Sequence, residues 1–228
     1  MRELFGRIAS KYDRMNRIMS LALDRRWRKA ALSLLPPLNS QPATLHALDL
    51  ACGTGDFAAA LLDICPCAAV TCVDITPEML DIARTKLASP SPLNPQPPTF
   101  LTGDAQDLAE LGDGSFDLAM CAFGFRNFPD KRKALAECRR LLKPGGKLVV
   151  LELFRPKSRI LGGIVRLWLA AISAIFAGGS RREYAYLRSS VASTVTGDEF
   201  VQMAKDAGFP SVRRRFLFPA ATALAFSR

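Results

Sequence analysis

The stretch LDLACGTGD occupies positions 48–56 of this 228-residue chain. Residues 45–50 read as a buried strand, residues 53–56 as a glycine turn, and the residues that follow as a helix to about position 64. The next apolar run, residues 68–73, is closed by Asp74. A strand, a glycine turn, a helix and an acid that ends the next strand form one half of a site for an adenosine-containing cofactor. The chain is therefore expected to perform group transfer or redox chemistry.

Strands and helices alternate through the rest of the chain. Further strands are expected at residues 99–102, 116–122 and 147–153, and helices at residues 76–88, 131–142 and 198–207. Gly145 and Gly146 are expected to stop the helix before the strand at 147–153. Residues 211–218 and 220–227 read as a hairpin. The pattern predicts an α/β fold with a mostly parallel sheet, helices on both faces, and an antiparallel strand at its C-terminal end.

We expect a single domain with four parts, since 228 residues suffice for one core. These are an N-terminal helical lid at residues 1–36, a cofactor-binding core at 37–155, a substrate-side helical insertion at 156–195, and a C-terminal helix and hairpin at 196–228. In the lid, Ile8, Tyr12, Met15 and Met19 share one helical face, and Asp24 can cap a second helix.

The charge of the chain favours anionic partners. Lys and Arg number 31 against 21 Asp and Glu, which gives a net charge of +10; nucleic acid, phosphates and acidic lipid all fit such a balance. Six cysteines without a CxxC pair and a single histidine argue against a metal site. The N-terminus lacks the apolar core of a secretory signal, so we expect a cytoplasmic protein.

Residues 160–179 are apolar and have the length of a membrane span. Arg166 and four glycines interrupt them, however, which favours a helix that lines a pocket or lies on a bilayer. Basic residues flank this segment, as they would in a peripheral protein on the inner face of an acidic membrane.

The glycine turn by itself also fits dinucleotide binders, because residues 53–58 satisfy GxGxxA. Asp49 inside the first strand, the GDA run after the third strand and the KPGG run before the fifth favour S-adenosylmethionine over NAD. Gly53 and Gly55 would let the backbone approach the cofactor, where a Cβ would collide. Asp74 can accept both ribose hydroxyls and Asp104 the adenine amino group, while Asp49 can hold the positively charged amino-acid end.

At this point the chain resembles a known family, the ubiquinone/menaquinone biosynthesis C-methyltransferases. The likeness covers nearly the whole length and rests on YDRMN at 12–16 with WR at 27–28, on FGFRN at 123–127, and on LKPGG at 142–146 followed by Glu152. It implies a Rossmann-like class I S-adenosylmethionine-dependent methyltransferase with a seven-stranded sheet. The expected cofactor site also includes Thr54, Ile75, Ala105 and Ala122, although the family often has a serine at the last position.

Members of this family methylate prenylated quinols. A ring carbon attacks the methyl group only when a neighbouring hydroxyl has nearly lost its proton, so the enzyme must favour a phenolate. We expect Arg126 to stabilise that oxyanion and Asn127 to orient the ring. Tyr12 and Tyr184 are candidate lid or proton-handling residues. Ordinary packing stays an alternative for both tyrosines.

Demethylmenaquinol is the favoured substrate, and 2-polyprenyl-6-methoxy-1,4-benzoquinol is the alternative within the family. A methyltransferase for RNA or another small molecule and a membrane-associated scaffold are further alternatives. Aromatic residues make up only 8% of the chain and do not interleave with basic ones, so we expect no nucleic-acid partner. The expected partners are the quinol and a membrane surface, and a homodimer stays open.

Overall fold

The structure of the protein is a computed structural model. It describes residues 6, 9, 12–13, 16–17, 20–37, 44–88, 97–175 and 181–228, without the side chains of residues 161, 166, 169, 171–175, 181–185 and 187. Ile8, Met15 and Met19 of the predicted helical face lie outside the described residues. The helices are α2 (Asp24–Leu32), α3 (Asp56–Leu62), α4 (Pro77–Lys86), η2 (Phe125–Asn127, a 3-10 turn), α5 (Lys131–Leu141), α6 (Arg159–Ile175), α7 (Arg181–Ser193) and α8 (Gly197–Asp206).

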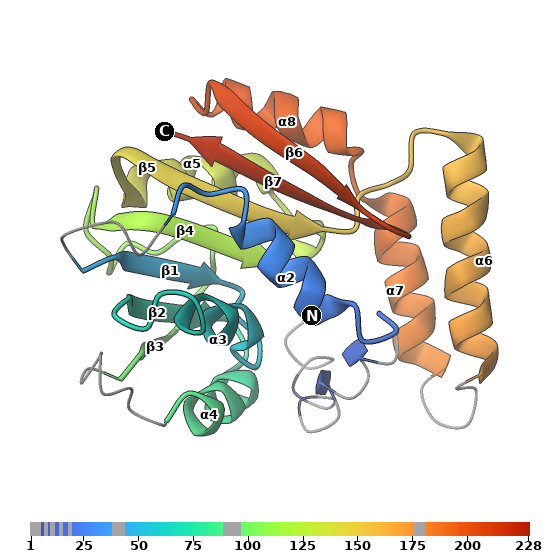
Figure 1. Ribbon diagram of the computed structural model, residues 1–228, viewed down its shortest axis with the longest axis horizontal. Helices are drawn as coiled ribbons and strands as arrows, with labels where there is room; N and C mark the ends of the chain where they lie inside the picture. Colours follow the sequence, from blue (N-terminus) through green and yellow to red (C-terminus); the bar gives the residue numbers. More distant parts are fainter. Residues whose placement is uncertain are drawn as a thin grey trace.

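Among the described residues, seven strands form one sheet at the centre of the molecule (Figure 1). They are β1 (His46–Leu50), β2 (Ala69–Asp74), β3 (Thr99–Thr102), β4 (Phe116–Ala122), β5 (Leu142–Glu152), β6 (Ser211–Leu217) and β7 (Ala221–Ser227). Their order is β3-β2-β1-β4-β5-β7-β6, and β7 runs antiparallel to both of its neighbours. The predicted α/β class, with its mostly parallel sheet and antiparallel C-terminal strand, is confirmed.

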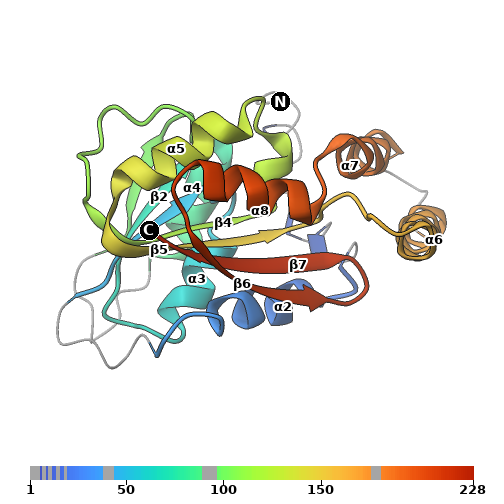
Figure 2. The ribbon, with the colours of Figure 1, turned by 90° about the horizontal axis from the view of Figure 1, so that it is seen from above.

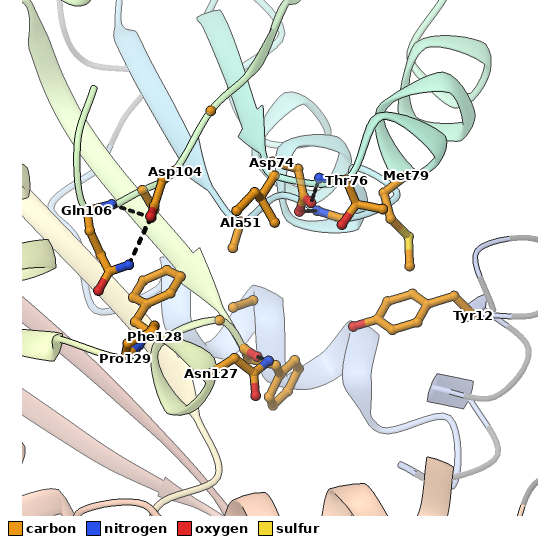
Figure 3. Close-up of a pocket in the computed structure, with 17 residues that line it drawn as sticks. Tyr12, Ala51, Asp74, Thr76, Met79, Asp104, Gln106, Asn127, Phe128 and Pro129 are labelled. Atoms are coloured by element: carbon orange, nitrogen blue, oxygen red, sulfur yellow. Dashed lines mark hydrogen bonds between the residues drawn. The ribbon is translucent and has the colours of Figure 1, made fainter. Parts of the chain in front are cut away.

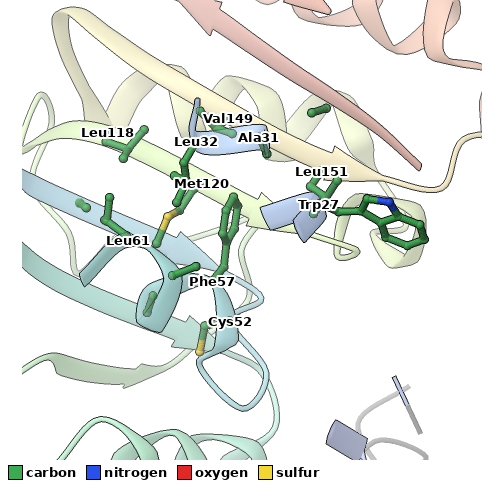
Figure 4. Packing of buried hydrophobic residues seen from close by; sticks show 14 of the residues in the cluster. Trp27, Ala31, Leu32, Cys52, Phe57, Leu61, Leu118, Met120, Val149 and Leu151 are labelled. Atoms are coloured by element: carbon green, nitrogen blue, oxygen red, sulfur yellow. The ribbon is translucent and has the colours of Figure 1, made fainter. Parts of the chain in front are cut away.

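Helices cover both faces of the sheet because its central strands are buried on both sides. Figure 2 shows α5 and α8 on one face and α2 and α3 on the other. Along β4, Leu118 and Met120 face the α2 and α3 side, while Ala119 and Cys121 pack toward α5 and α8. Figure 4 shows the first of these layers around Phe57. The helices α6 and α7 form a pair beyond the carboxyl ends of β4 and β5 (Figure 1).

Two local predictions were wrong. Gly145 and Gly146 do not stop α5, which ends at Leu141; β5 already begins at Leu142, because this fully buried leucine adopts an extended conformation and pairs with Phe116. Asp24 does not cap α2. It is the first residue of the helix, and its carboxylate instead pairs with Arg28 at 2.6 Å.

Candidate active site

The site lies where the strand order reverses between β1 and β4, at the carboxyl ends of the parallel strands. This is the usual ligand position in open α/β sheets. A cavity, called the cofactor cavity here, opens between the loops that follow β1 to β4 (Figure 3). Its lining includes eight of the predicted residues: Tyr12, Gly53, Asp74, Ile75, Asp104, Ala105, Ala122 and Asn127.

The two glycines of the turn have different roles. Gly53 has a φ of 54° and lines the cavity, and a Cβ there would meet only Tyr12 Cε1, at 3.8 Å. Gly55 has a φ of 82°, but a Cβ there would lie 3.0 Å from Leu87 and 3.2 Å from Ala83. Gly55 is therefore required by the packing of the turn against α4 and is not part of the cavity wall. This differs from the predicted close approach of Gly55 to the cofactor.

Asp74 is held rigidly at the end of β2. Its carboxylate accepts hydrogen bonds from the backbone N–H groups of Gly53 and Thr76, both at 2.8 Å. Each oxygen keeps a further lone pair for a ligand. Burial raises the pKa of Asp74 above its ordinary value, while the two backbone donors oppose that shift. The arrangement suits a carboxylate that accepts two neighbouring hydroxyl groups.

The loop after β3 forms the other end of the cavity. The carboxylate of Asp104 accepts hydrogen bonds from the backbone N–H of Gln106 at 2.9 Å and from its side-chain amide at 3.0 Å (Figure 3). Ala105, Phe128 and Pro129 add apolar surface beside it. An apolar slot next to a fixed acceptor fits a heteroaromatic base with an exocyclic amino group.

Asp49 lies in a second, smaller cavity that shares Tyr12, Gly53 and Phe123 with the first. It is 1% exposed. One oxygen accepts the backbone N–H of Ala58 at 3.0 Å, and among the described residues the other has no hydrogen-bond partner. Burial raises the pKa of Asp49 to about 8. A buried acceptor without a donor fits a cationic group, such as the ammonium of an amino acid.

Thr54 lines the smaller cavity together with Asp49, not the cofactor cavity, and it joins the turn to the N-terminal segment. Its hydroxyl donates to Asp13, and Lys86 Nζ donates to Thr54 Oγ1 at 3.1 Å. The same ammonium lies 2.6 Å from carboxylate oxygens of both Asp13 and Asp56. Burial raises the pKa of Asp56, but Arg28 and then Lys86 outweigh this effect and lower it. This charge cluster ties Asp13, the neighbour of Tyr12 in the chain, to the glycine turn and to α4.

Arg126 does not line the cofactor cavity. It lies in the adjoining pocket, called the aromatic pocket here, with Trp27, Phe123, Leu153, Trp168, Asn16, Ser20 and Asp24. Its Nη1 donates to Glu152 Oε1 at 2.8 Å and to the backbone oxygen of Phe123 at 2.7 Å. Both charged side chains are buried, at 8% and 1% exposure. The ion pair outweighs desolvation and raises the pKa of Arg126, so its guanidinium stays protonated.

Phe123 belongs to the walls of all three cavities. It follows β4 with a φ of 60°, a left-handed conformation that a large side chain rarely adopts. Its backbone N–H donates to Leu151 at 2.7 Å, and its carbonyl accepts Arg126. These contacts hold the strained residue at the junction between cofactor and aromatic pocket, which is typical of a functional position.

Asn127 faces the cofactor cavity, and Tyr186 from α7 donates to its Oδ1 at 2.8 Å. This contact was not predicted, since Tyr184 was chosen from the same helix. Tyr184 lies on α7, but its side chain is outside the described residues. Burial raises the pKa values of both Tyr12 and Tyr186, so both are protonated at neutral pH. Each hydroxyl therefore keeps its proton and can donate a hydrogen bond.

Trp168, Glu152 and Lys86 were also missing from the predicted site. Glu152 was visible as the end of a motif, but its partner Arg126 is distant in sequence. Lys86 lies at the end of a helix whose sequence contains no motif that indicates a functional site. It is 73 positions from its partner Asp13. Trp168 belongs to an apolar run in which a pocket wall cannot be told from an exposed face by sequence.

This chain is similar to known proteins over nearly its whole length. A model of the ubiE/COQ5 methyltransferase family matches residues 1–226. A demethylmenaquinone methyltransferase from Thermotoga maritima is 40% identical over 90% of this chain and 86% of its own length. One from Deinococcus radiodurans is 40% identical over 96% of this chain and 88% of its own. A ubiquinone/menaquinone biosynthesis C-methyltransferase from Geobacter sp. is 34% identical, with corresponding shares of 93% and 89%.

Solved structures support the fold. A SAM-dependent methyltransferase from Thermotoga maritima has a TM-score of 0.67 at 23% identity and covers 100% of this chain and 99% of its own. The family match also includes the helices outside the sheet, and so extends to the aromatic pocket. The protein is a SAM-dependent methyltransferase, and the chain belongs to the ubiE/COQ5 methyltransferase family.

Proposed function

We propose that this enzyme methylates a ring carbon of a prenylated quinol, with demethylmenaquinol as its substrate. The main support is the aromatic pocket beside the cofactor cavity. Trp27, Phe123, Trp168 and Leu153 offer apolar walls, and the buried guanidinium of Arg126 lies among them. A flat ring with an ionisable oxygen matches such a pocket. The names of the relatives from Thermotoga maritima and Deinococcus radiodurans point to the same substrate.

S-adenosylmethionine supplies an already activated methyl group when bound, and Asp49, Asp74 and Asp104 are the residues that would hold it. The ring carbon would form a bond to the transferred methyl group, the electron pair of the broken carbon–sulfur bond would stay with sulfur, and the ring proton would leave to water. Arg126 favours the phenolate that makes the ring carbon nucleophilic, because its buried N–H groups stabilise negative charge. Glu152 neutralises part of the positive charge of Arg126 and fixes its guanidinium in place.

Asn127 would orient the ring. Since Tyr186 occupies its Oδ1, the amide nitrogen is turned toward other acceptors, among them the backbone oxygen of Phe123 at 3.5 Å. No strong base is needed, because the methyl donor is already activated and the pocket shifts the substrate's own ionisation. Holding ring and methyl group in line would supply much of the remaining rate enhancement.

We further propose that the enzyme works at an acidic membrane surface. Three residues of α6 share one exposed face: Ile160, Ile164 and Leu167 are 78%, 41% and 73% exposed. Exposed Lys157, Arg159 and Arg188 border a groove between α6 and α7. Apolar side chains next to basic ones fit the boundary between lipid headgroups and chains. In the part of the chain that the structure describes, no helix is long and apolar enough to cross a bilayer.

The substrate is tested by incubating purified protein with methyl-labelled S-adenosylmethionine and one acceptor at a time: demethylmenaquinol, 2-polyprenyl-6-methoxy-1,4-benzoquinol or total RNA. Label should enter the naphthoquinol fastest. Label in RNA with none in the organic extract would refute the proposal.

Membrane association is tested by sedimentation with phosphatidylglycerol vesicles. Replacing Ile164 and Leu167 by serine should reduce binding, because it removes the apolar face of α6. The control is Phe216→Ser on β6, where the phenylalanine is 48% exposed. Equal sedimentation of all three proteins would contradict the assignment of this face.

A further inference from the structure

Two residues that line the aromatic pocket each carry a buried N–H for which the described part of the chain supplies no acceptor. Among the described residues, Arg126 Nε and Trp168 Nε1 are both inaccessible to solvent and unpartnered. Both residues line the pocket. The other indole of the pocket is satisfied, since Trp27 Nε1 donates to the backbone oxygen of Phe218 at 3.3 Å. A buried donor without an acceptor destabilises a fold, so two in one small apolar pocket indicate an acceptor supplied by a ligand.

The carboxylates at this pocket already have donors. Asp24 accepts from Arg28 at 2.6 Å and from Ser20 at 3.1 Å. Glu152 accepts from Arg126 Nη1 at 2.8 Å, from the Arg126 backbone at 3.0 Å and from the Leu153 backbone at 2.8 Å. The unused N–H groups therefore favour a ligand that brings an oxygen acceptor, above all a negatively charged one.

We infer that the acceptor ring binds in the aromatic pocket, with one ring oxygen between Arg126 Nε–H and Trp168 Nε1–H. Trp168 is then a substrate-binding residue that selects the ionised oxygen, and Trp27, Phe123 and Leu153 enclose the ring. The assignment rests on the proposed function. It also fits the position of Phe123, whose side of the pocket adjoins the cavities assigned to the methyl donor.

The location of Trp168 on α6 links the pocket to the proposed membrane face. Trp168 is partly buried and packs against the core cluster that contains Trp27 and Leu153, whereas its neighbour Leu167 is 73% exposed. Of these two successive residues of α6, Trp168 therefore faces the pocket and Leu167 faces the outside of the protein. A prenylated quinol could enter from the bilayer along α6. Its ring would then reach Trp168 inside the protein while its prenyl tail stays in the lipid.

The test is Trp168→Phe, which keeps an aromatic ring and removes the indole N–H together with part of the ring volume. We expect kcat/KM for demethylmenaquinol to fall by about 10- to 100-fold, the effect of losing a hydrogen bond to a charged oxygen. The Kd for S-adenosylmethionine should not change. The pH profile of kcat should move to higher pH by roughly one unit, because the bound phenol loses a donor that favours its ionised form. Phe216→Leu is the comparison: this residue lies on β6 outside the pocket and is 48% exposed, so neither kcat/KM nor the pH profile should change.

A binding measurement separates this inference from the proposed function. In the Trp27→Phe background Trp168 is the only tryptophan, since the chain has two. Its fluorescence should be quenched saturably by a short-chain 1,4-naphthoquinone. If the wild type methylates the quinol, but Trp168→Phe keeps its kcat/KM and pH profile and no quenching occurs, the inference is wrong and the proposed function stands. If the wild type methylates no quinol and Trp168 is not quenched, both fail.

Discussion

Replacing Asp49 by asparagine should stabilise the protein at neutral pH while weakening its binding of S-adenosylmethionine. Burial raises the pKa of Asp49 from 3.8 to about 8. Between about pH 4 and pH 8 the folded state therefore holds a proton that the unfolded state has released, and the free energy of unfolding falls as pH rises through this window. Asparagine carries no charge and escapes this penalty.

The size of the effect follows from the two pKa values. At about 1.36 kcal/mol per pH unit above the unfolded value, the penalty in the wild type is roughly 4 kcal/mol at pH 7 and roughly 2 kcal/mol at pH 5. The amide NH2 of the asparagine would take the place of the unpartnered oxygen. Burying it without an acceptor lowers the free energy of unfolding by about 1–3 kcal/mol. The variant should thus gain about 1–3 kcal/mol at pH 7 and almost nothing at pH 5.

Urea unfolding at pH 5, 6, 7 and 8 measures this difference, and calorimetry measures ligand binding. Affinity should fall about 10- to 100-fold, because the carboxylate would hold the ammonium group. Near pH 7 the wild type should release close to one proton from Asp49 when it binds S-adenosylmethionine. Calorimetry in buffers of different ionisation enthalpy detects this release. The variant should release no proton from this position. Asp81→Asn, at an exposed carboxylate paired with Arg84, should change neither quantity. A variant that is destabilised equally at every pH and keeps its affinity would refute the reasoning.

Three further substitutions test other parts of the site. Gly55→Ala should destabilise the fold by about 1–3 kcal/mol through overpacking against Leu87 and Ala83, whereas Gly53→Ala should mainly raise the Kd for S-adenosylmethionine; equal effects in denaturation and calorimetry would contradict the two roles. Lys86→Met should raise that Kd several-fold and increase hydrogen exchange at residues 12, 13, 16 and 17, because Asp13 and Asp56 lose their shared cation; unchanged exchange would count against the charge cluster. Tyr186→Phe should lower kcat about 5- to 10-fold with an unchanged cofactor Kd, since it removes the hydrogen bond to Asn127, and an unaltered kcat would show that this bond is dispensable.

The sheet could be predicted from sequence because its signals are local. The central strands are short apolar runs, and the glycine turn follows directly from its spacing. Helix ends were harder: the extended conformation of Leu142 depends on its pairing with Phe116, a contact across the sheet. The carboxylates of the cofactor site could be predicted for the same reason as the strands, because each carboxylate lies within a strand or shortly after its end.

The substrate side depends on contacts between distant segments. Tyr184 and Tyr186 are two positions apart on α7, and only the packing of that helix against η2 shows that Tyr186 reaches Asn127. Trp168 faces the pocket and Leu167 faces outward, and this difference depends on the orientation of α6 in the fold. The partnership of Lys86 with Asp13 joins residues without any shared motif. Such contacts arise from tertiary structure, which a pattern of residue types does not specify.

The central claim is transfer of the methyl group to carbon in a quinol ring. It is tested most directly by reacting purified enzyme with demethylmenaquinol and trideuteromethyl-labelled S-adenosylmethionine and locating the label by NMR and mass spectrometry. We predict the trideuteromethyl group on the ring carbon that carries the missing methyl, with little product from Arg126→Ala. A label on a ring oxygen, or full turnover by Arg126→Ala, would contradict it.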